Sequence, residues 1–105
     1  MGLLALSSLA VTYSLVSIQA MRALVKSGDT AKVILFANTA RSKDIYRMAG
    51  NYLQTLNWKE NADLMRKIEQ FYLKADALDS IASFYEACAQ VWSNMYWYMQ
   101  NWIFR

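Results

Sequence analysis

Few side chains of this chain could act as an acid, a base or a nucleophile. The sequence has no His, which removes the commonest general base and the commonest metal ligand. Its one Cys, Cys88, excludes an internal disulfide and any zinc site built on cysteines. Asp76 and Asp79 resemble an acidic pair, but their position at an expected helix start favours a capping role. We therefore predict no catalytic, cofactor-binding or metal-ligating residues and no enzyme activity.

Three further features have both a functional and a structural interpretation. Cys88 lies beside Ala87 and Ala89 with no basic activator nearby in the sequence, so we expect a buried, unreactive thiol. Five aromatic residues could form a binding slot, but their helical spacing favours packing between helices: Tyr52, Phe71, Tyr72, Phe84 and Tyr85. Four basic residues could form a stripe for acidic partners, but a solvated helix face is the simpler interpretation: Lys59, Arg66, Lys67 and Lys74.

Charge is concentrated in the middle of the chain. All charged residues except Arg105 lie between Arg22 and Glu86, where acidic and basic types alternate. The net charge is +3, but no basic run of the kind that marks a nucleic-acid-binding protein occurs, so we predict no nucleic-acid partner. Two uncharged, apolar ends flank this charged middle.

The middle of the chain has the apolar spacing of amphipathic helices. Gly28 predicts a left-handed helix terminator, and Asp29 predicts the N-cap of the next helix. Ser42 predicts the start of another helix. Its apolar positions recur over three turns, which is the clearest periodicity in the chain: Ile45, Met48, Ala49, Tyr52, Leu53 and Leu56.

Two more helices follow. Asn57 and Glu60 approach a capping box, while Asn61 is a rival N-cap one turn later. We expect the fourth helix to bury Leu64, Ile68, Phe71 and Ala75. Asp76 predicts the N-cap of the fifth helix. Its expected apolar stripe consists of Leu78, Ile81, Ala82, Tyr85, Cys88 and Ala89.

These helices predict an all-α fold of antiparallel helix hairpins, because joints of about two to five residues fold neighbouring helices back on each other. Ser42 and Asp76 are about 34 residues apart, the period of tetratricopeptide (TPR) helix pairs. The consensus residues of that repeat do not line up, and a solenoid needs about three repeats. We therefore expect a TPR-like α-solenoid fragment of a longer array.

Three segments between about Ala20 and Gln90 are unusual as strings: KSGDTAKVILFAN, IYRMAGNYLQTL and ALDSIASFYEACAQ. In this order they resemble the C-terminal helical-repeat region in the family of the hundred-and-forty-kilodalton subunit of intraflagellar transport complex A. The resemblance implies a structural, non-enzymatic subunit without a cofactor, in which two β-propellers precede a long α-solenoid. It also implies other complex A subunits as partners, and a place in the cilium, at the ciliary base and in the cytoplasm.

The resemblance predicts three parts of the chain. Residues 1–19 are an unmatched apolar segment, residues 20–90 the α-solenoid fragment, and residues 91–105 an unmatched aromatic tail. Because the flanks depart from the family and no propeller is present, we expect a fragment, with the middle carrying the partner contacts.

The two ends leave an alternative open. Leu3–Val16 has the apolar core of a secretory signal or a short membrane span, but it lacks a positive start and contains several hydroxyls. The tail has helical spacing that could extend the fifth helix, through Trp92, Met95, Tyr96, Met99 and Ile103. The alternative function is a small membrane-associated or secreted helical protein defined by these ends.

Overall fold

The computed structural model describes the backbone of residues 2–103 and the side chains of residues 13–94. It consists of five α-helices and one short 3₁₀ helix, in the order α1 (Gly2–Ser27), α2 (Thr30–Ala40), α3 (Lys43–Gln54), η1 (Trp58–Glu60), α4 (Ala62–Lys74) and α5 (Leu78–Ile103). No β-strand occurs within residues 2–103. The all-α prediction is confirmed.

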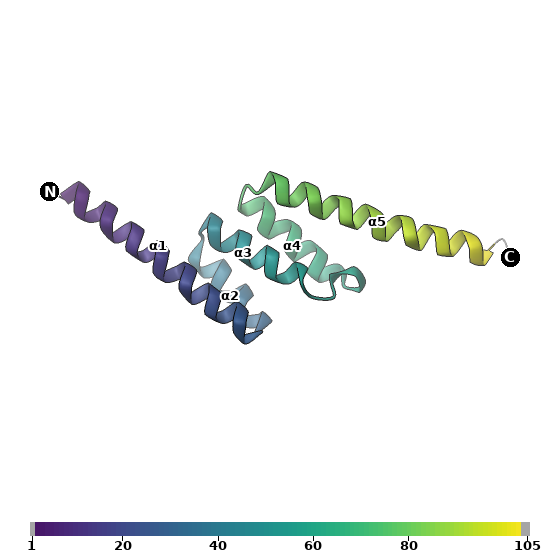
Figure 1. Ribbon diagram of the computed structural model, residues 1–105, viewed down its shortest axis with the longest axis horizontal. Coiled ribbons are helices and arrows are strands. Elements are labelled where there is room, and N and C mark those ends of the chain that lie inside the picture. Colours follow the sequence, from purple (N-terminus) through teal and green to yellow (C-terminus); the bar gives the residue numbers. More distant parts are fainter. Residues whose placement is uncertain (1, 104–105) are drawn as a thin grey trace.

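Consecutive helices pack against one another, and α1 also contacts α3. Figure 1 shows α2, α3 and α4 at the centre, with the N-terminal part of α1 and the C-terminal part of α5 extending away from them in opposite directions. Short connections fold each helix back on its predecessor, as expected for helix hairpins. This serial stacking is the arrangement of a TPR-like helical repeat.

The predicted start of α2 is confirmed at Gly28 and Asp29. Gly28 has φ +74°, and it ends α1 in the left-handed conformation that glycine adopts at low cost. Asp29 has an extended backbone, and its Oδ1 accepts a hydrogen bond from the Lys32 amide at 3.2 Å. Ser42 occupies the N-cap position of α3, as predicted, but its side chain makes no capping hydrogen bond.

Asn61, rather than Asn57, is the N-cap of α4. The Asn61 Oδ1 accepts hydrogen bonds from the amides of Asp63 and Leu64, at 3.0 and 3.2 Å. Asn57 precedes η1, and its amide nitrogen donates to Glu60 Oε2 at 3.3 Å. The near-capping-box pattern therefore belongs to a separate 3₁₀ turn between α3 and α4.

The prediction that Asp76 is the N-cap of α5 is wrong. Asp76 has φ +52°, and its amide donates to the Leu73 carbonyl while the Ala77 amide donates to the Tyr72 carbonyl. These two bonds form a Schellman motif, which ends α4. The Ala77 carbonyl accepts the first bond of α5, from the Ile81 amide at 2.9 Å. Asp76 therefore belongs to the end of α4, and the next residue, Ala77, accepts the first hydrogen bond of α5.

The core lies between α1 and α5 and contains aromatic rings from three elements. The Trp58 and Phe84 rings meet edge to face with centroids 5.0 Å apart, and Tyr72 approaches Phe84 at 6.3 Å. Ile45, Ala49 and Leu53 of α3 are buried, as their periodicity predicts. The fourth helix buries Ile68, Phe71 and Ala75 as expected, with Leu64 half-buried.

The predicted apolar stripe of α5 is partly wrong. Leu78 and Tyr85 are 73% and 46% exposed, whereas Phe84, outside the predicted stripe, is 1% exposed. The buried face instead follows Ala77, Ile81 and Phe84, and Val91 packs beside it. Apolar residues surround more than half of this helix, so periodicity alone could not select the side that faces the core.

Both ends of the described chain are helical. α1 is continuous across residues 19 and 20, and α5 across residues 90 and 91, so each predicted boundary lies inside a helix. The fifth helix extends through the tail to Ile103, as the spacing predicts; the side chains beyond residue 94 lie outside the described residues. Within the described part of the chain, every helix is too short or too polar to cross a membrane.

Candidate functional site

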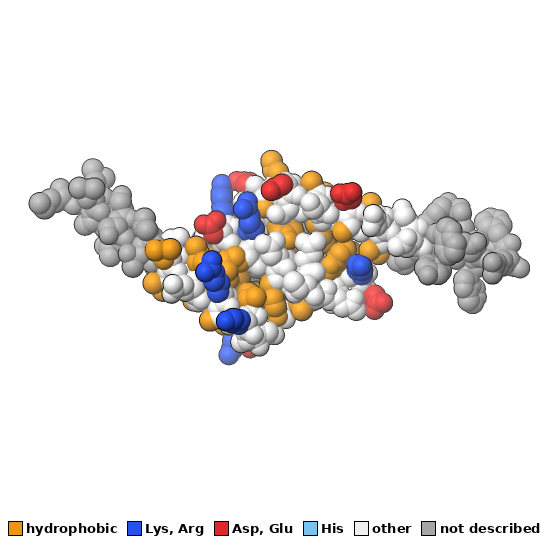
Figure 2. All heavy atoms as spheres, viewed as in Figure 1, with side chains coloured by type: hydrophobic (Ala, Val, Ile, Leu, Met, Phe, Trp, Pro, Cys, Tyr) orange, Lys and Arg blue, Asp and Glu red, His pale blue; other side chains and the backbone are white. Residues whose placement is uncertain are grey.

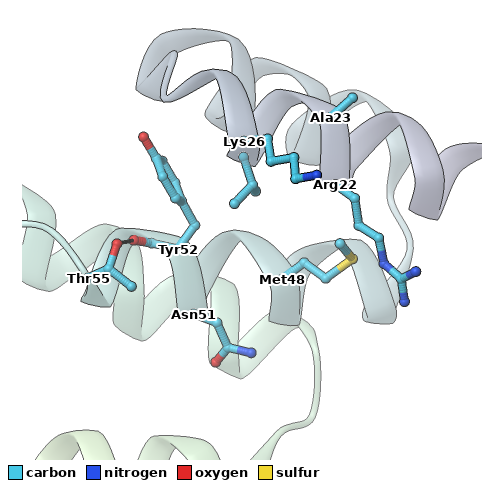
Figure 3. Close-up of a pocket in the computed structure, with 8 residues that line it drawn as sticks. Arg22, Ala23, Lys26, Met48, Asn51, Tyr52 and Thr55 are labelled. Carbon is cyan, nitrogen blue, oxygen red and sulfur yellow. Dashed lines mark hydrogen bonds between the residues drawn. The ribbon is translucent and has the colours of Figure 1, made fainter.

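A groove with a volume of about 860 Å³ runs between α1 and α3. Figure 3 shows Arg22 and Lys26 of α1 on one side of it and Met48 and Tyr52 of α3 on the other. Eight residues form its walls and floor: Arg22, Ala23, Val25, Lys26, Met48, Asn51, Tyr52 and Thr55. The lining comes from two helices that are separated in sequence by all of α2, so only the stacked fold creates this surface.

The α3 side of the groove follows from helix periodicity. Met48 and Tyr52 are one turn apart, and both are half-buried against the core. The Tyr52 hydroxyl lies 3.1 Å from Thr30 Oγ1 at the start of α2, which holds the ring in place. An apolar ring and a flexible thioether therefore form a floor suited to apolar side chains.

Asn51 and Thr55 form the neutral polar edge of the groove, also one turn apart on α3. The Thr55 hydroxyl donates to the Tyr52 carbonyl at 2.6 Å (Figure 3). Asn51 Oδ1 lies 2.8 Å from the Tyr72 hydroxyl, which connects this edge to the core. Both residues are exposed, so their remaining hydrogen-bonding capacity is available to a ligand.

The α1 edge of the groove is basic. Arg22 and Lys26 are one turn apart on the same face of α1, and both are exposed. Among the residues whose side chains are described, neither forms an ion pair, whereas Lys32, Lys43 and Arg66 each pair with an aspartate. The groove thus presents two positive charges beside an apolar floor, which suits a peptide segment carrying carboxylates and apolar side chains.

The basic stripe considered from the sequence is not a single site. Lys59 lies 6.0 Å from the centre of the Trp58 ring, and Lys74 lies 5.5 Å from that of Tyr46. Arg66 pairs with Asp63 at 3.3 Å. All four residues of the stripe are exposed, which agrees with a solvated face. Arg22 and Lys26 were not identified from the sequence, although their spacing of four residues places them on one helix face.

The other candidate residues also take structural positions. Phe71, Tyr72 and Phe84 are buried in the core, Tyr52 is half-buried and Tyr85 is exposed. The aromatic residues therefore form no common slot.

Cys88 is half-buried, and Asp76 forms an ion pair with Lys43 at 2.7 Å. The hydrogen bond from Lys43 to Asp76, and the charge of Asp76, raise the pKa of Lys43. Within the described residues, no three His, Cys, Asp or Glu side chains come together as possible metal ligands.

The chain matches a known family of helical-repeat domains. A family model for the TPR domain of intraflagellar transport proteins 140 and 172 matches residues 8–71. The match begins inside the apolar segment that the resemblance had left unmatched, and it ends within α4. It includes α1 from Ser8 onward, the whole of α3 and every residue that lines the groove. Since the match covers more than half of the sequence and the stacked helices agree with it, the chain belongs to this family of intraflagellar transport TPR domains.

Proposed function

We propose that this chain is a structural scaffold of intraflagellar transport that binds other subunits of intraflagellar transport complex A. Membership of the intraflagellar transport TPR domain family supports this proposal, because stacked helical repeats provide extended surfaces for protein partners. The proposed role is binding rather than catalysis, at the ciliary base, in the cilium and in the cytoplasm.

The observation that carries the proposal is the groove between α1 and α3. Its apolar floor and basic edge fit a partner segment in which acidic residues lie beside apolar ones. The partner's carboxylates would face Arg22 and Lys26, and its apolar side chains would cover Met48 and Tyr52. The partner would thereby supply the negative charges that the described part of this chain does not place there.

The test is co-purification from ciliated cells expressing the tagged chain, with complex A subunits quantified by mass spectrometry. Arg22→Glu reverses one charge at the groove, and we expect a loss of recovery of about fivefold, corresponding to about 1 kcal/mol. Lys67→Glu is the matched control, since Lys67 is an exposed residue within α4 that does not line the groove. We expect this control to retain the subunits.

Two results would contradict the proposal. Failure of the unmodified chain to recover any complex A subunit would reject the scaffold role. Equal recovery by Arg22→Glu and the unmodified chain would reject the groove as the contact surface. Circular dichroism of both variants shows whether the helical fold is preserved.

A further inference from the structure

The outer side of α5 carries an exposed apolar seam. Its residues alternate at spacings of four and three: Leu78, Ala82, Tyr85, Ala89 and Trp92. All five are exposed, with Leu78 at 73% and Trp92 at 66%. Spacings of four and three residues are those of a helix surface that packs against another helix. The seam lies beside, and is distinct from, the face of α5 that covers the core.

Exposed apolar side chains are frequent on α4 and α5. Among residues 13–94, half of the large hydrophobic side chains that are exposed belong to α4 and α5: Leu73, Leu78, Tyr85 and Trp92. In stacked helical repeats, an outermost helix that faces water has a polar outer face. Between Leu78 and Trp92, the outer side of α5 instead carries the apolar seam, so this part has the character of a surface between two helices.

The seam is bordered by acidic residues on both sides. Asp79 and Glu86 are exposed, and each directly follows a seam residue on α5. On the other side is Glu69 of α4: burial raises the pKa of Tyr85 and of Cys88, and the nearby charge of Glu69 raises both further. The sequence contains no Lys or Arg from Leu78 to Ile103. Over α5, Figure 2 shows hydrophobic side chains in orange and acidic ones in red.

We propose that the α4–α5 surface docks an amphipathic helix of another polypeptide, with an apolar face for the seam and Lys or Arg residues along both edges of that face. The apolar face would cover Leu78, Tyr85 and Trp92. Its basic edges would face Glu69 on one side and Glu86 on the other. This surface is separate from the groove between α1 and α3, and the two have opposite charge preferences.

The net charge of the protein makes a preference for a basic peptide a specific sign of binding at the seam. With a net charge of +3, the chain as a whole repels a basic peptide and attracts an acidic one. A preference for the basic peptide must therefore come from a local acidic surface. The groove, whose edge carries Arg22 and Lys26, would favour the acidic peptide.

The experiment uses the full chain and two fluorescent helical peptides of about three heptads. Both peptides carry Leu at the seam positions; one carries Lys and the other Glu along the two edges. Fluorescence anisotropy measures binding at low salt. We expect the Lys peptide to bind about tenfold tighter than the Glu peptide, because several exposed charge pairs act together.

Two variants locate the contact. Tyr85→Glu places a charge at the centre of the seam, and we expect it to weaken binding of the Lys peptide by about tenfold or more. Tyr13→Glu is the matched control, because Tyr13 is an exposed tyrosine of α1, and it should bind as the unmodified chain does. Leu78→Glu gives a second variant on the seam if Tyr85→Glu fails to fold. Glu86→Lys should reduce the preference for the Lys peptide.

Three outcomes would overturn the proposal. The Lys peptide could fail to bind, or both seam variants could bind it as tightly as the unmodified chain does. The chain could also sediment as a dimer that Tyr85→Glu dissociates, which would make a second copy the occupant of this surface.

Discussion

Gly50 of α3 lies directly against the ring of Tyr72 on α4. A β-carbon at position 50 would lie 2.7 Å from Cε1 and 2.9 Å from Cδ1 of that ring. The Tyr72 side chain is 1% exposed, and its hydroxyl lies 2.8 Å from Asn51 Oδ1 and 2.7 Å from Gln54 Oε1. The ring is therefore held at its hydroxyl and along one edge, and α3 and α4 can approach this closely because Gly50 has no side chain.

Gly50→Ala should destabilise the protein by about 1–3 kcal/mol, as expected for overpacking a filled site. At an exposed helical position the same change would stabilise by about 0.5–1 kcal/mol, because Ala has the higher helix propensity. The measurement is urea denaturation followed by circular dichroism.

Ser83→Ala, at an exposed position of α5, is the control for this helix-propensity effect and should be neutral or slightly stabilising. In Gly50→Ala/Tyr72→Leu, the loss should be smaller than the sum of the single losses, since the smaller side chain relieves the contact. A stabilising effect of Gly50→Ala alone would show that Tyr72 moves away at little cost.

Gly28→Val should destabilise by about 1 kcal/mol or more, because a β-branched residue is strained at φ +74°. No atom lies within 4 Å of the position where its β-carbon would be, so the cost is conformational rather than a clash. Gly28→Asn should cost less, since Asn tolerates the left-handed region. Equal thermal denaturation midpoints for the Val and Asn variants would contradict this explanation.

Phe84→Ala should cost about 3–5 kcal/mol, whereas Tyr85→Ala should cost much less. The two residues are adjacent in the sequence, but Phe84 contacts the Trp58 and Tyr72 rings while Tyr85 is 46% exposed. Guanidinium denaturation of both variants measures the difference. A larger loss for Tyr85→Ala would mean that α5 is rotated about its axis relative to this structure.

Cys88 should react slowly with iodoacetamide in the folded protein at about pH 9, and faster once urea unfolds the chain. Burial raises the pKa of the Cys88 thiol, and the charge of Glu69 raises it further. The Cys88 thiol therefore keeps its proton to a higher pH in the folded chain than in the unfolded chain. As the pH rises above the ordinary pKa of a thiol, its ionisation favours the unfolded chain and lowers the free energy of unfolding. Below that pH it has no such effect.

Glu69→Gln removes the negative charge beside the thiol and should increase the folded-state reaction rate at the same pH. Mass spectrometry of the alkylated chain gives both rates. Identical rates for the folded and urea-unfolded chains would contradict the raised pKa.

Local sequence determined the helices and several of their ends. Gly28 and Asp29 specify the α1–α2 turn, because a left-handed terminator and a side-chain cap depend only on residues a few positions away. The α3 stripe was also readable, since polar residues separate its apolar positions clearly. The resemblance of the sequence to an intraflagellar transport subunit is confirmed at the level of the family.

Tertiary structure decided which helix faces are buried and which surfaces form grooves. Ala77, rather than Asp76, accepts the first hydrogen bond of α5, because Asp76 belongs to the Schellman motif that ends α4. The buried side of α5 is the one on which Phe84 packs against Trp58. The sequence of α5 does not determine this side, because apolar residues occur on two of its faces. Arg22 and Met48 share a groove only because α1 and α3, which α2 separates in the sequence, pack together. Helical periodicity depends on neighbours within one turn, whereas grooves and seams depend on which helices meet, and that is settled by packing over the whole chain.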